Sequence, residues 1–150
     1  ICRQGHRQAE AARAAMIVVD SNVIACLYLP GELNAKAENL LEKEPDWAAP
    51  LLWRSELRNI LALYMRRKSL DFNSAYRIQR EAEALMADHE YDVDSFEALT
   101  LALDSGCSAY DCEFIVLAKQ LGVKLVAEDA KLRQAFPRLT VGIAEGQCRT

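Results

Sequence analysis

The chain has 150 residues, which suits one domain with a core of its own. Apolar residues make up 51% and charged residues 27%, values that argue against an intrinsically disordered protein. A formal net charge of −4 argues against a duplex-binding protein with a broad basic face, but it leaves room for a nuclease whose metal ions offset local acidity. No apolar run approaches membrane-spanning length, so no membrane association is expected.

The first 15 residues differ in composition from the rest of the chain. Residues 1–15 are rich in Ala, Arg and Gln and precede a methionine, so we expect an expression remnant or an upstream extension there and a domain over residues 16–150. The five cysteines form no CxxC pair, and His6 and His89 stand apart from them. This pattern disfavours a zinc site and predicts reduced thiols in a cytoplasmic protein.

A short apolar run that ends in an aspartate opens the domain. Met16–Val19 predicts a strand buried on both faces, as in a parallel sheet, and residues 22–29 predict a helix. Asp20 therefore lies at the carboxyl edge of the sheet, where open α/β sheets bind ligands. Aspartate also caps helices. Because Ser21 or Asn22 could cap this helix without a charge, we favour a functional role for Asp20.

Two long helices are predicted in the middle of the chain, over residues 51–68 and 72–88, and they form a helical hairpin. The first of them places Glu56 and Asn59 on one face among leucines. A carboxylate that borders an apolar face is costly unless it is paired, which favours a functional role for Glu56. Two shorter elements precede the hairpin: a helix over about residues 34–43 and a strand over residues 47–49.

The C-terminal half alternates strands and helices. The predicted elements are a strand over residues 91–93, helices over 95–104 and 112–121, and strands over 124–127 and 140–143. Phe96, Leu99 and Leu103 are expected to face inward. Asp111 falls in a first helical turn, where the helix dipole explains a carboxylate about as well as function does. Asp129 follows the predicted strand over residues 124–127 in the same way as Asp20 follows the first strand.

The alternation predicts an α/β fold with a parallel sheet and right-handed crossovers. Asp20 and Asp129 would then emerge at the same sheet edge. Asp111 heads the helix that leads into the second of these strands, and Glu56 lies on an inward helix face. Each acid has a structural explanation, but one shared site explains all four together. Oxygen donors without His or Cys suit Mg²⁺ or Mn²⁺ better than zinc.

Three stretches carry a resemblance to a known family: MIVVDSNVIACLYLPGE, APLLWRSELRNIL and SAYDCEFIVLAKQLGVKLVAEDAKL. In this order and spacing they resemble the PIN-domain ribonucleases, in particular the VapC-type toxins of bacterial toxin–antitoxin modules. The resemblance implies a three-layer α/β/α fold with a short parallel central sheet and a protruding helical hairpin. It carries the family's metal-site acids onto Asp20, Glu56, Asp111 and Asp129, and supporting polar roles onto Asn22 and Asn59.

The implied activity is metal-assisted hydrolysis of RNA in a type II toxin–antitoxin system, with Mg²⁺ or Mn²⁺ as cofactor. The implied partners are an RNA substrate, an antitoxin whose C-terminal segment wraps the toxin, and a second copy in a homodimer. The hairpin over residues 51–88 is the expected surface for the antitoxin groove and the dimer contacts. One position departs from the family, because Ala127 stands where Ser or Thr commonly precedes the last acid by two residues.

Two other functions stay open. Ala127 is compatible with a non-catalytic PIN-like module that binds RNA or protein. A strand-end aspartate also occurs in phosphotransfer domains, but receivers need a second acid at the first strand and a later strand-end lysine. Phosphatases of the haloacid-dehalogenase type need a second Asp two positions after the first, where this chain has Asn22.

Overall fold

The computed structural model describes residues 16–144, so the expectation for residues 1–15 lies outside the described residues. Within them, five parallel strands form a sheet in the order β3-β2-β1-β4-β5. The strands are β1 (Met16–Val19), β2 (Asp46–Pro50), β3 (Glu90–Tyr91), β4 (Leu125–Val126) and β5 (Thr140–Val141). The helices are α2 (Ser21–Tyr28), α3 (Asn34–Lys43), α4 (Trp53–Arg66), α5 (Phe72–Met86), α6 (Ser95–Ser105), α7 (Ala109–Leu121) and α8 (Ala130–Ala135).

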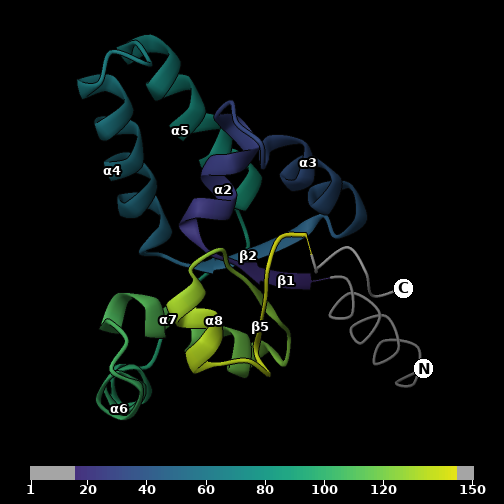
Figure 1. The fold of residues 1–150 in the computed structure, drawn as a ribbon, viewed down its shortest axis with the longest axis vertical. Coiled ribbons are helices and arrows are strands. Elements are labelled where there is room, and N and C mark those ends of the chain that lie inside the picture. The colour runs from purple at the N-terminus through teal and green to yellow at the C-terminus, as the bar shows by residue number, and fades with distance from the viewer. Residues whose placement is uncertain (1–15, 145–150) are drawn as a thin grey trace.

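The helices form a layer on each face of the sheet (Figure 1). Helices α2 to α5 lie on one face, and α6, α7 and α8 lie on the other. Helix α7 packs against β1, β2 and β4, while α4 and α5 pair and extend away from the sheet. The predicted three-layer α/β/α fold with a parallel sheet and a protruding hairpin is confirmed.

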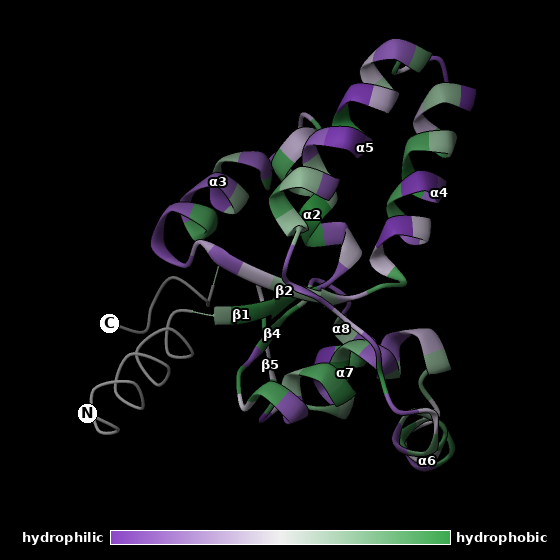
Figure 2. Ribbon diagram, turned by 180° about the vertical axis from the view of Figure 1, so that it is seen from behind, coloured by the Kyte–Doolittle hydropathy of each residue, from purple (hydrophilic) through white to green (hydrophobic). Residues whose placement is uncertain are grey.

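The core lies where β1 meets its two neighbouring strands and α7. Ile17, Val18 and Val19 of β1 are buried, as a strand covered on both faces requires. Helix α7 lies between the sheet and α6, so most of its length is apolar (Figure 2). Its residues Phe114 to Ala118 are buried. Trp47 of β2 and Trp53 of α4 are the largest fully buried side chains.

Every predicted strand and helix is present, and the differences are at the ends. The bounds of β1 and α3 are as predicted, while β3 is Glu90–Tyr91 where residues 91–93 were expected. Helix α7 begins at Ala109, three residues earlier than predicted, because the hydroxyl of Ser108 accepts a hydrogen bond from the Asp111 N–H at 3.1 Å. Gly122 ends α7 with φ 67, a left-handed conformation that glycine adopts without strain.

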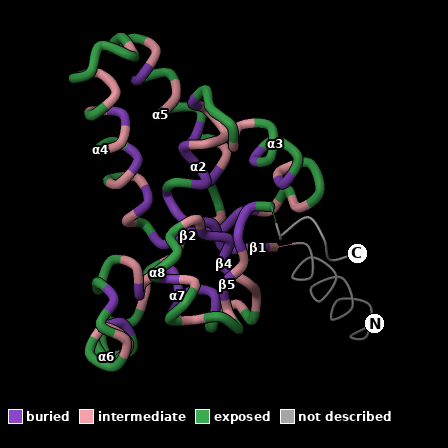
Figure 3. The backbone as a smooth tube through the Cα atoms, in the orientation of Figure 1, coloured by how far each residue is buried: buried purple, intermediate pink, exposed green. Residues whose placement is uncertain are grey.

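The predicted inward face of α6 is wrong. Phe96, Leu99 and Leu103 are 78%, 64% and 85% exposed, respectively. Most of α6 is exposed (Figure 3). Helix α6 packs against α7 through a different face, which includes the buried Ala98 and the partly buried Ala102. The sequence SFEALTLALDS is apolar on more than one side, so its periodicity could not tell which face has a neighbour.

A charged cluster fixes the base of the hairpin to the sheet. Arg54 on α4 donates to both carboxylate oxygens of Glu90, from Nε at 2.6 Å and from Nη2 at 2.8 Å. It also pairs with Glu83 of α5 at 2.8 Å, and the Trp53 indole donates to Glu90 at 2.7 Å. The hydrogen bond from Arg54 is the main cause that lowers the pKa of Glu90. One arginine thus joins α4, α5 and β3.

We expect Glu90→Ala to lower the free energy of unfolding by about 1–2 kcal/mol, since Arg54 and the Trp53 indole both lose a hydrogen-bond acceptor. Glu83→Ala is the matched control, because it removes a single contact of the same arginine and should have a smaller effect. Urea unfolding at pH 7 measures both. Because the pKa of Glu90 is lowered by folding, its contribution is present above the ordinary pKa of glutamate and is lost as the pH falls through the folded value. An equal loss in both variants would contradict this role of Glu90.

Two further predictions concerned the redox state of the cysteines and membrane-spanning segments. The three cysteines that the structure describes, Cys26, Cys107 and Cys112, are free thiols, as the composition predicted. Within residues 16–144, no helix has the length and apolar character needed to cross a bilayer.

Candidate active site

Asp20 lies at the carboxyl end of the central strand. The chain continues from β1 toward β2 and β3 on one side, whereas β4 and β5 add to the other side, so Asp20 is at the point where the strand order reverses. Its side chain is 8% exposed, and Oδ1 accepts a hydrogen bond from the Val23 N–H at 2.8 Å. Asp20 is therefore the N-cap of α2, a role that the sequence had favoured for Ser21 or Asn22. A carboxylate has about four acceptor sites, so capping leaves room for another ligand.

The environment of Asp20 is unfavourable for its negative charge. Burial raises the pKa of Asp20 from 3.8 to about 7, and the negative charges of Glu56 and Glu128 act in the same direction. Hydrogen bonds from the backbone N–H groups of Val23 and Glu128 oppose the rise without cancelling it. A cation beside Asp20 would favour its charged form.

Glu56 of α4 faces the same region. The buried hydroxyl of Ser21 donates a hydrogen bond to Glu56 Oε1 at 2.9 Å, across 35 residues of sequence. Burial is the main cause that raises the pKa of Glu56, and the negative charges of Asp111 and Glu113 add to it. As the sequence indicated, neither neighbouring arginine pairs with Glu56: Arg54 binds Glu83 and Glu90, and Arg58 contacts Ser55.

The other two predicted acids are placed differently. Asp111 lies in the first turn of α7, partly exposed, and its charge acts on Glu56. Asp129 is exposed and caps α8, with Oδ1 accepting from the Leu132 N–H at 2.9 Å. Interactions in the structure thus connect Asp20, Glu56 and Asp111, while the Asp129 carboxylate is engaged with its own helix.

A hollow of about 470 Å³ opens in front of Glu56. Its lining comes from α2, α4, the turn before α4 and the first turn of α7: Ser21, Asn22, Leu52, Ser55, Glu56, Asn59, Ile60 and Tyr110. Asn22 and Asn59, the predicted supporting polar residues, are both exposed and both line it. The hollow therefore combines a carboxylate, amides and hydroxyls with one exposed aromatic ring, which suits a polar and extended ligand.

Sequence reasoning missed three contributors to this region. Ser21 orients Glu56 through its hydrogen bond. The sequence carried a signal for this role, because a hydroxyl that directly follows a buried strand needs a hydrogen-bond partner. Glu128 acts on Asp20 while its Oε1 accepts a hydrogen bond from the Ile143 N–H at 2.6 Å. Glu113 acts on Glu56 from one turn along α7. Ala127 is fully buried and provides no hydroxyl there.

The donor set fits a hard divalent cation, because all the acids offer oxygen and two of them have raised pKa values. Among residues 16–144, however, no three His, Cys, Asp or Glu side chains stand close enough to share one ion. Like charges keep carboxylates apart unless a cation lies between them. Binding an ion would therefore draw these side chains inward.

Comparisons with known proteins agree with this fold. The family model described as "PIN domain" matches residues 17–136. Ribonuclease VapC3 of Pyrobaculum aerophilum is 32% identical over 127 residues, which cover 82% of this chain and 96% of that protein.

Two solved structures share the fold at lower sequence identity. The crystal structure of PAE2754 from Pyrobaculum aerophilum superposes with a TM-score of 0.71 and 19% identity, covering 87% of this chain and 85% of that one. The crystal structure of FitAcB from Neisseria gonorrhoeae gives a TM-score of 0.65 and 20% identity, over 86% and 99% of the two chains. With the family match over most of its length, the chain belongs to the PIN domain family.

Proposed function

We propose that the protein is a Mg²⁺- or Mn²⁺-dependent ribonuclease that acts as the toxin of a type II toxin–antitoxin system. Its similarity to a protein named Ribonuclease VapC3 supports the substrate class. The observation that carries the proposal is the position of Asp20: a buried carboxylate at the switch point of the sheet, beside two other acids, with a pKa raised to about 7. Such a carboxylate is suited to a bound cation.

In this proposal Asp20 and Asp111 hold the principal ion, and Glu56 and Asp129 complete its shell or hold a second ion. A bound Mg²⁺ ion would supply a water of lowered pKa and offset negative charge on the phosphate. The chain's own residues do the rest. Ser21 holds the Glu56 carboxylate through its hydroxyl, and Asn22 and Asn59 present amides to the hollow, where they donate to phosphate or ribose oxygens.

The proposal includes protein partners, an antitoxin and a second copy in a homodimer. A basic residue from an antitoxin segment would complement the hollow in front of Glu56, which we call the acidic hollow. A second hollow of about 390 Å³ lies between α2 and α4 and shares Asn22 and Ile60 with the acidic one. A segment bound along α2 and α4 would therefore reach the acids, which supports this side of the hairpin as the antitoxin groove.

Cleavage of total cellular RNA by the antitoxin-free protein tests the proposal. We expect discrete fragments with Mg²⁺ or Mn²⁺ and none with EDTA, and sequencing of the fragment ends would name the target. Fragments that persist in EDTA after treatment of the protein with chelator would exclude metal-assisted cleavage.

A non-catalytic PIN-like module is the second candidate, favoured by Ala127, where the hydroxyl common in the family is missing. Mn²⁺ binding without cleavage of any RNA tested would select this module in place of the ribonuclease.

A further inference from the structure

The distal part of the hairpin is strongly basic, although the whole chain carries a net charge of −4. Between residues 58 and 80 there is one acid, Asp71, and there are six basic residues: Arg58, Arg66, Arg67, Lys68, Arg77 and Arg80. All six are exposed, and none forms a salt bridge with another residue within 16–144. The end of α4 accounts for the cations at residues 66–68, but Arg58, Arg77 and Arg80 lie inside their helices. A surface of this charge suits a polyanion such as RNA.

A hollow of about 270 Å³ lies between α4 and α5 on this part of the hairpin. Leu61, Met65 and Ala75 line it with apolar groups, while Arg58 and Arg80 line it with positive charge. The acid of its lining, Glu83, is already paired with Arg54 at 2.8 Å. The hollow therefore combines apolar surface with cations that are free to meet an anionic ligand.

Two aromatic rings stack in parallel at this hollow. Phe72 and Tyr76 lie one turn apart on α5, with ring centroids 6.2 Å apart and an interplanar angle of 5°. They are 69% and 58% exposed, so core packing does not account for them. Parallel aromatic rings beside cations are the arrangement on which proteins stack the bases of single-stranded nucleic acids.

Gln79 adds an unsatisfied hydrogen-bonding group to the same lining. The side chain is 7% exposed, and Nε2 donates to the Arg54 carbonyl oxygen at 3.3 Å. Oε1 is buried and has no hydrogen-bond partner among the described residues. A buried acceptor of this kind is costly without a donor, and a nucleobase carries N–H donors on its edges.

We propose that this face of the hairpin is a second RNA-binding surface, outside the acidic hollow. We call it the aromatic–basic surface and define it by Arg58, Phe72, Tyr76, Gln79 and Arg80. Bases of a single-stranded segment stack on Phe72 and Tyr76, and its phosphates lie against Arg58 and Arg80. The inference rests on the proposed ribonuclease function, because the RNA bound here is the one that is cleaved, but none of these five residues takes part in hydrolysis.

The aromatic–basic surface and the acidic hollow adjoin along α4. Ser55 lines the acidic hollow, Arg58 lines the hollow between α4 and α5, and Arg58 Nη1 donates to the Ser55 hydroxyl at 3.5 Å. An RNA strand that crosses α4 at this point reaches both. The antitoxin groove uses other residues of α4, namely Ile60, Leu63 and Tyr64, so an antitoxin segment bound there leaves the aromatic–basic surface open.

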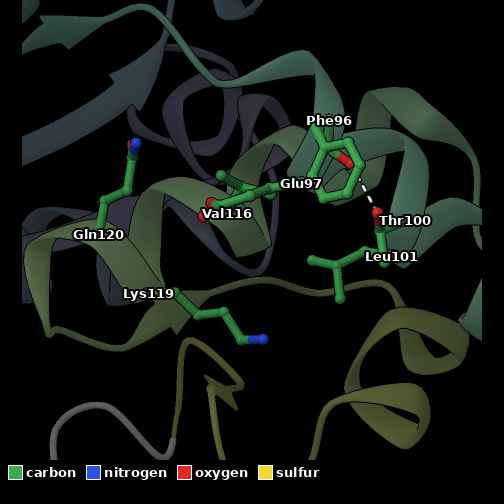
Figure 4. Close-up of a pocket in the computed structure, with 7 residues that line it drawn as sticks. All are labelled: Phe96, Glu97, Thr100, Leu101, Val116, Lys119 and Gln120. Carbon is green, nitrogen blue, oxygen red and sulfur yellow. Dashed lines mark hydrogen bonds between the residues drawn. The ribbon is translucent and has the colours of Figure 1, made fainter.

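The hollow between α6 and α7 lacks this character (Figure 4). Its volume is about 310 Å³, and the exposed ring of Phe96 lines it. Its two charged lining residues, Glu97 and Lys119, have opposite signs, so it offers no excess of positive charge to a phosphate backbone. An exposed aromatic ring beside a hollow is thus common to both places, and the charge favours the hairpin for RNA.

Fluorescence anisotropy of a labelled, unstructured RNA oligonucleotide tests the stacking, with the protein in EDTA so that no cleavage is expected. Tyr76→Leu keeps an apolar side chain but removes the ring, and it should raise the RNA dissociation constant on the order of 10-fold. Tyr76→Phe is the matched control, because it keeps the ring and should bind RNA as the parent does. Circular dichroism and melting check that both variants are folded.

The salt dependence of the same binding tests the phosphate contacts. Arg80→Gln should reduce the slope of log K against log salt concentration by about 0.7, as expected for the loss of one phosphate contact of a single strand. Arg138→Gln is the control, since it removes an exposed arginine from the connection between α8 and β5. That variant should leave the slope unchanged.

Other outcomes overturn the inference. The surface is excluded if the parent does not bind the oligonucleotide, or if Tyr76→Leu and Arg80→Gln bind it with the parent's affinity and salt slope. Equal losses in Tyr76→Leu and Tyr76→Phe would exclude stacking. If an antitoxin peptide loses affinity for these variants while RNA does not, the surface binds the antitoxin instead.

Cleavage with Mg²⁺ is measured separately, so the two proposals fail independently. A parent that binds RNA through the aromatic–basic surface but cuts none would contradict the proposed function and leave this inference standing. A parent that cuts RNA, with hairpin variants that bind it unchanged, would contradict the inference and leave the function standing.

Discussion

Asp20→Asn is expected to lower metal-dependent RNA cleavage on the order of 10³-fold, because it removes the buried charge that the proposed ion requires. Asparagine has nearly the same volume, and its side-chain oxygen can still accept the hydrogen bond from the Val23 N–H that begins α2. The fold should therefore survive. Initial rates on one RNA substrate across a Mg²⁺ titration measure the effect.

A matched control separates loss of the charge from loss of a helix cap. Asp94 also caps a helix, with its carboxylate accepting from the Glu97 N–H at 3.1 Å, but it is exposed and does not line the acidic hollow. Asp94→Asn should cleave RNA at the parent's rate. If Asp20→Asn did so too, the assignment of the metal site would be wrong.

The metal-free protein is expected to lose stability as the pH rises from about 4 to about 7. The folded-state pKa of Asp20, about 7, is above its ordinary value of 3.8, so between these values the folded chain binds a proton that the unfolded chain has released. The unfolding free energy therefore falls through this window and levels off above it, by about 2–4 kcal/mol for a shift of this size. Urea unfolding in EDTA at pH 5 and pH 8 measures the difference.

Asp20→Asn should remove most of this pH dependence, because asparagine does not titrate, and should make the metal-free protein more stable than the parent at pH 8. A small residual slope of the same sign is expected from Glu56, whose pKa is also raised. Saturating Mn²⁺ at pH 8 should stabilise the parent more than the variant. Identical pH profiles for the two proteins would contradict the raised pKa of Asp20.

Features that depend only on neighbouring residues, such as the bounds of a strand, could be predicted from the sequence. The apolar run before Asp20 predicted both ends of the central strand correctly. A β-branched run that is followed by an acid and then by a helix is compatible with few other structures. The same pattern at Asp129 predicted an equivalent acid, yet Asp20 is buried and Asp129 is exposed. The difference arises because β1 is the central strand, whereas β4 has only the two-residue β5 outside it. A local pattern does not reveal a strand's place in the sheet.

Long-range contacts were equally hidden from the sequence. The hydrogen bond from Ser21 to Glu56 spans 35 residues, and the Arg54–Glu90 pair spans 36. On α6, three large apolar residues were predicted to be buried because large apolar side chains usually are. The helix instead uses alanines for its contact with α7, and only the tertiary structure shows which of two apolar faces has a neighbour.

The strands β4 and β5, which lead to and follow Asp129, are very short, and this determines what holds Asp129 in place. Strands β4 and β5 have two residues each, so few ladder hydrogen bonds hold that edge, whereas β1 is paired on both sides. Apolar packing holds the edge instead, because Leu125, Leu132 and Ile143 are at most 2% exposed and belong to the core. The backbone N–H of Asp20 also donates to the Val126 carbonyl oxygen at 3.1 Å. The position of Asp129 relative to Asp20 therefore depends on core packing more than on strand pairing.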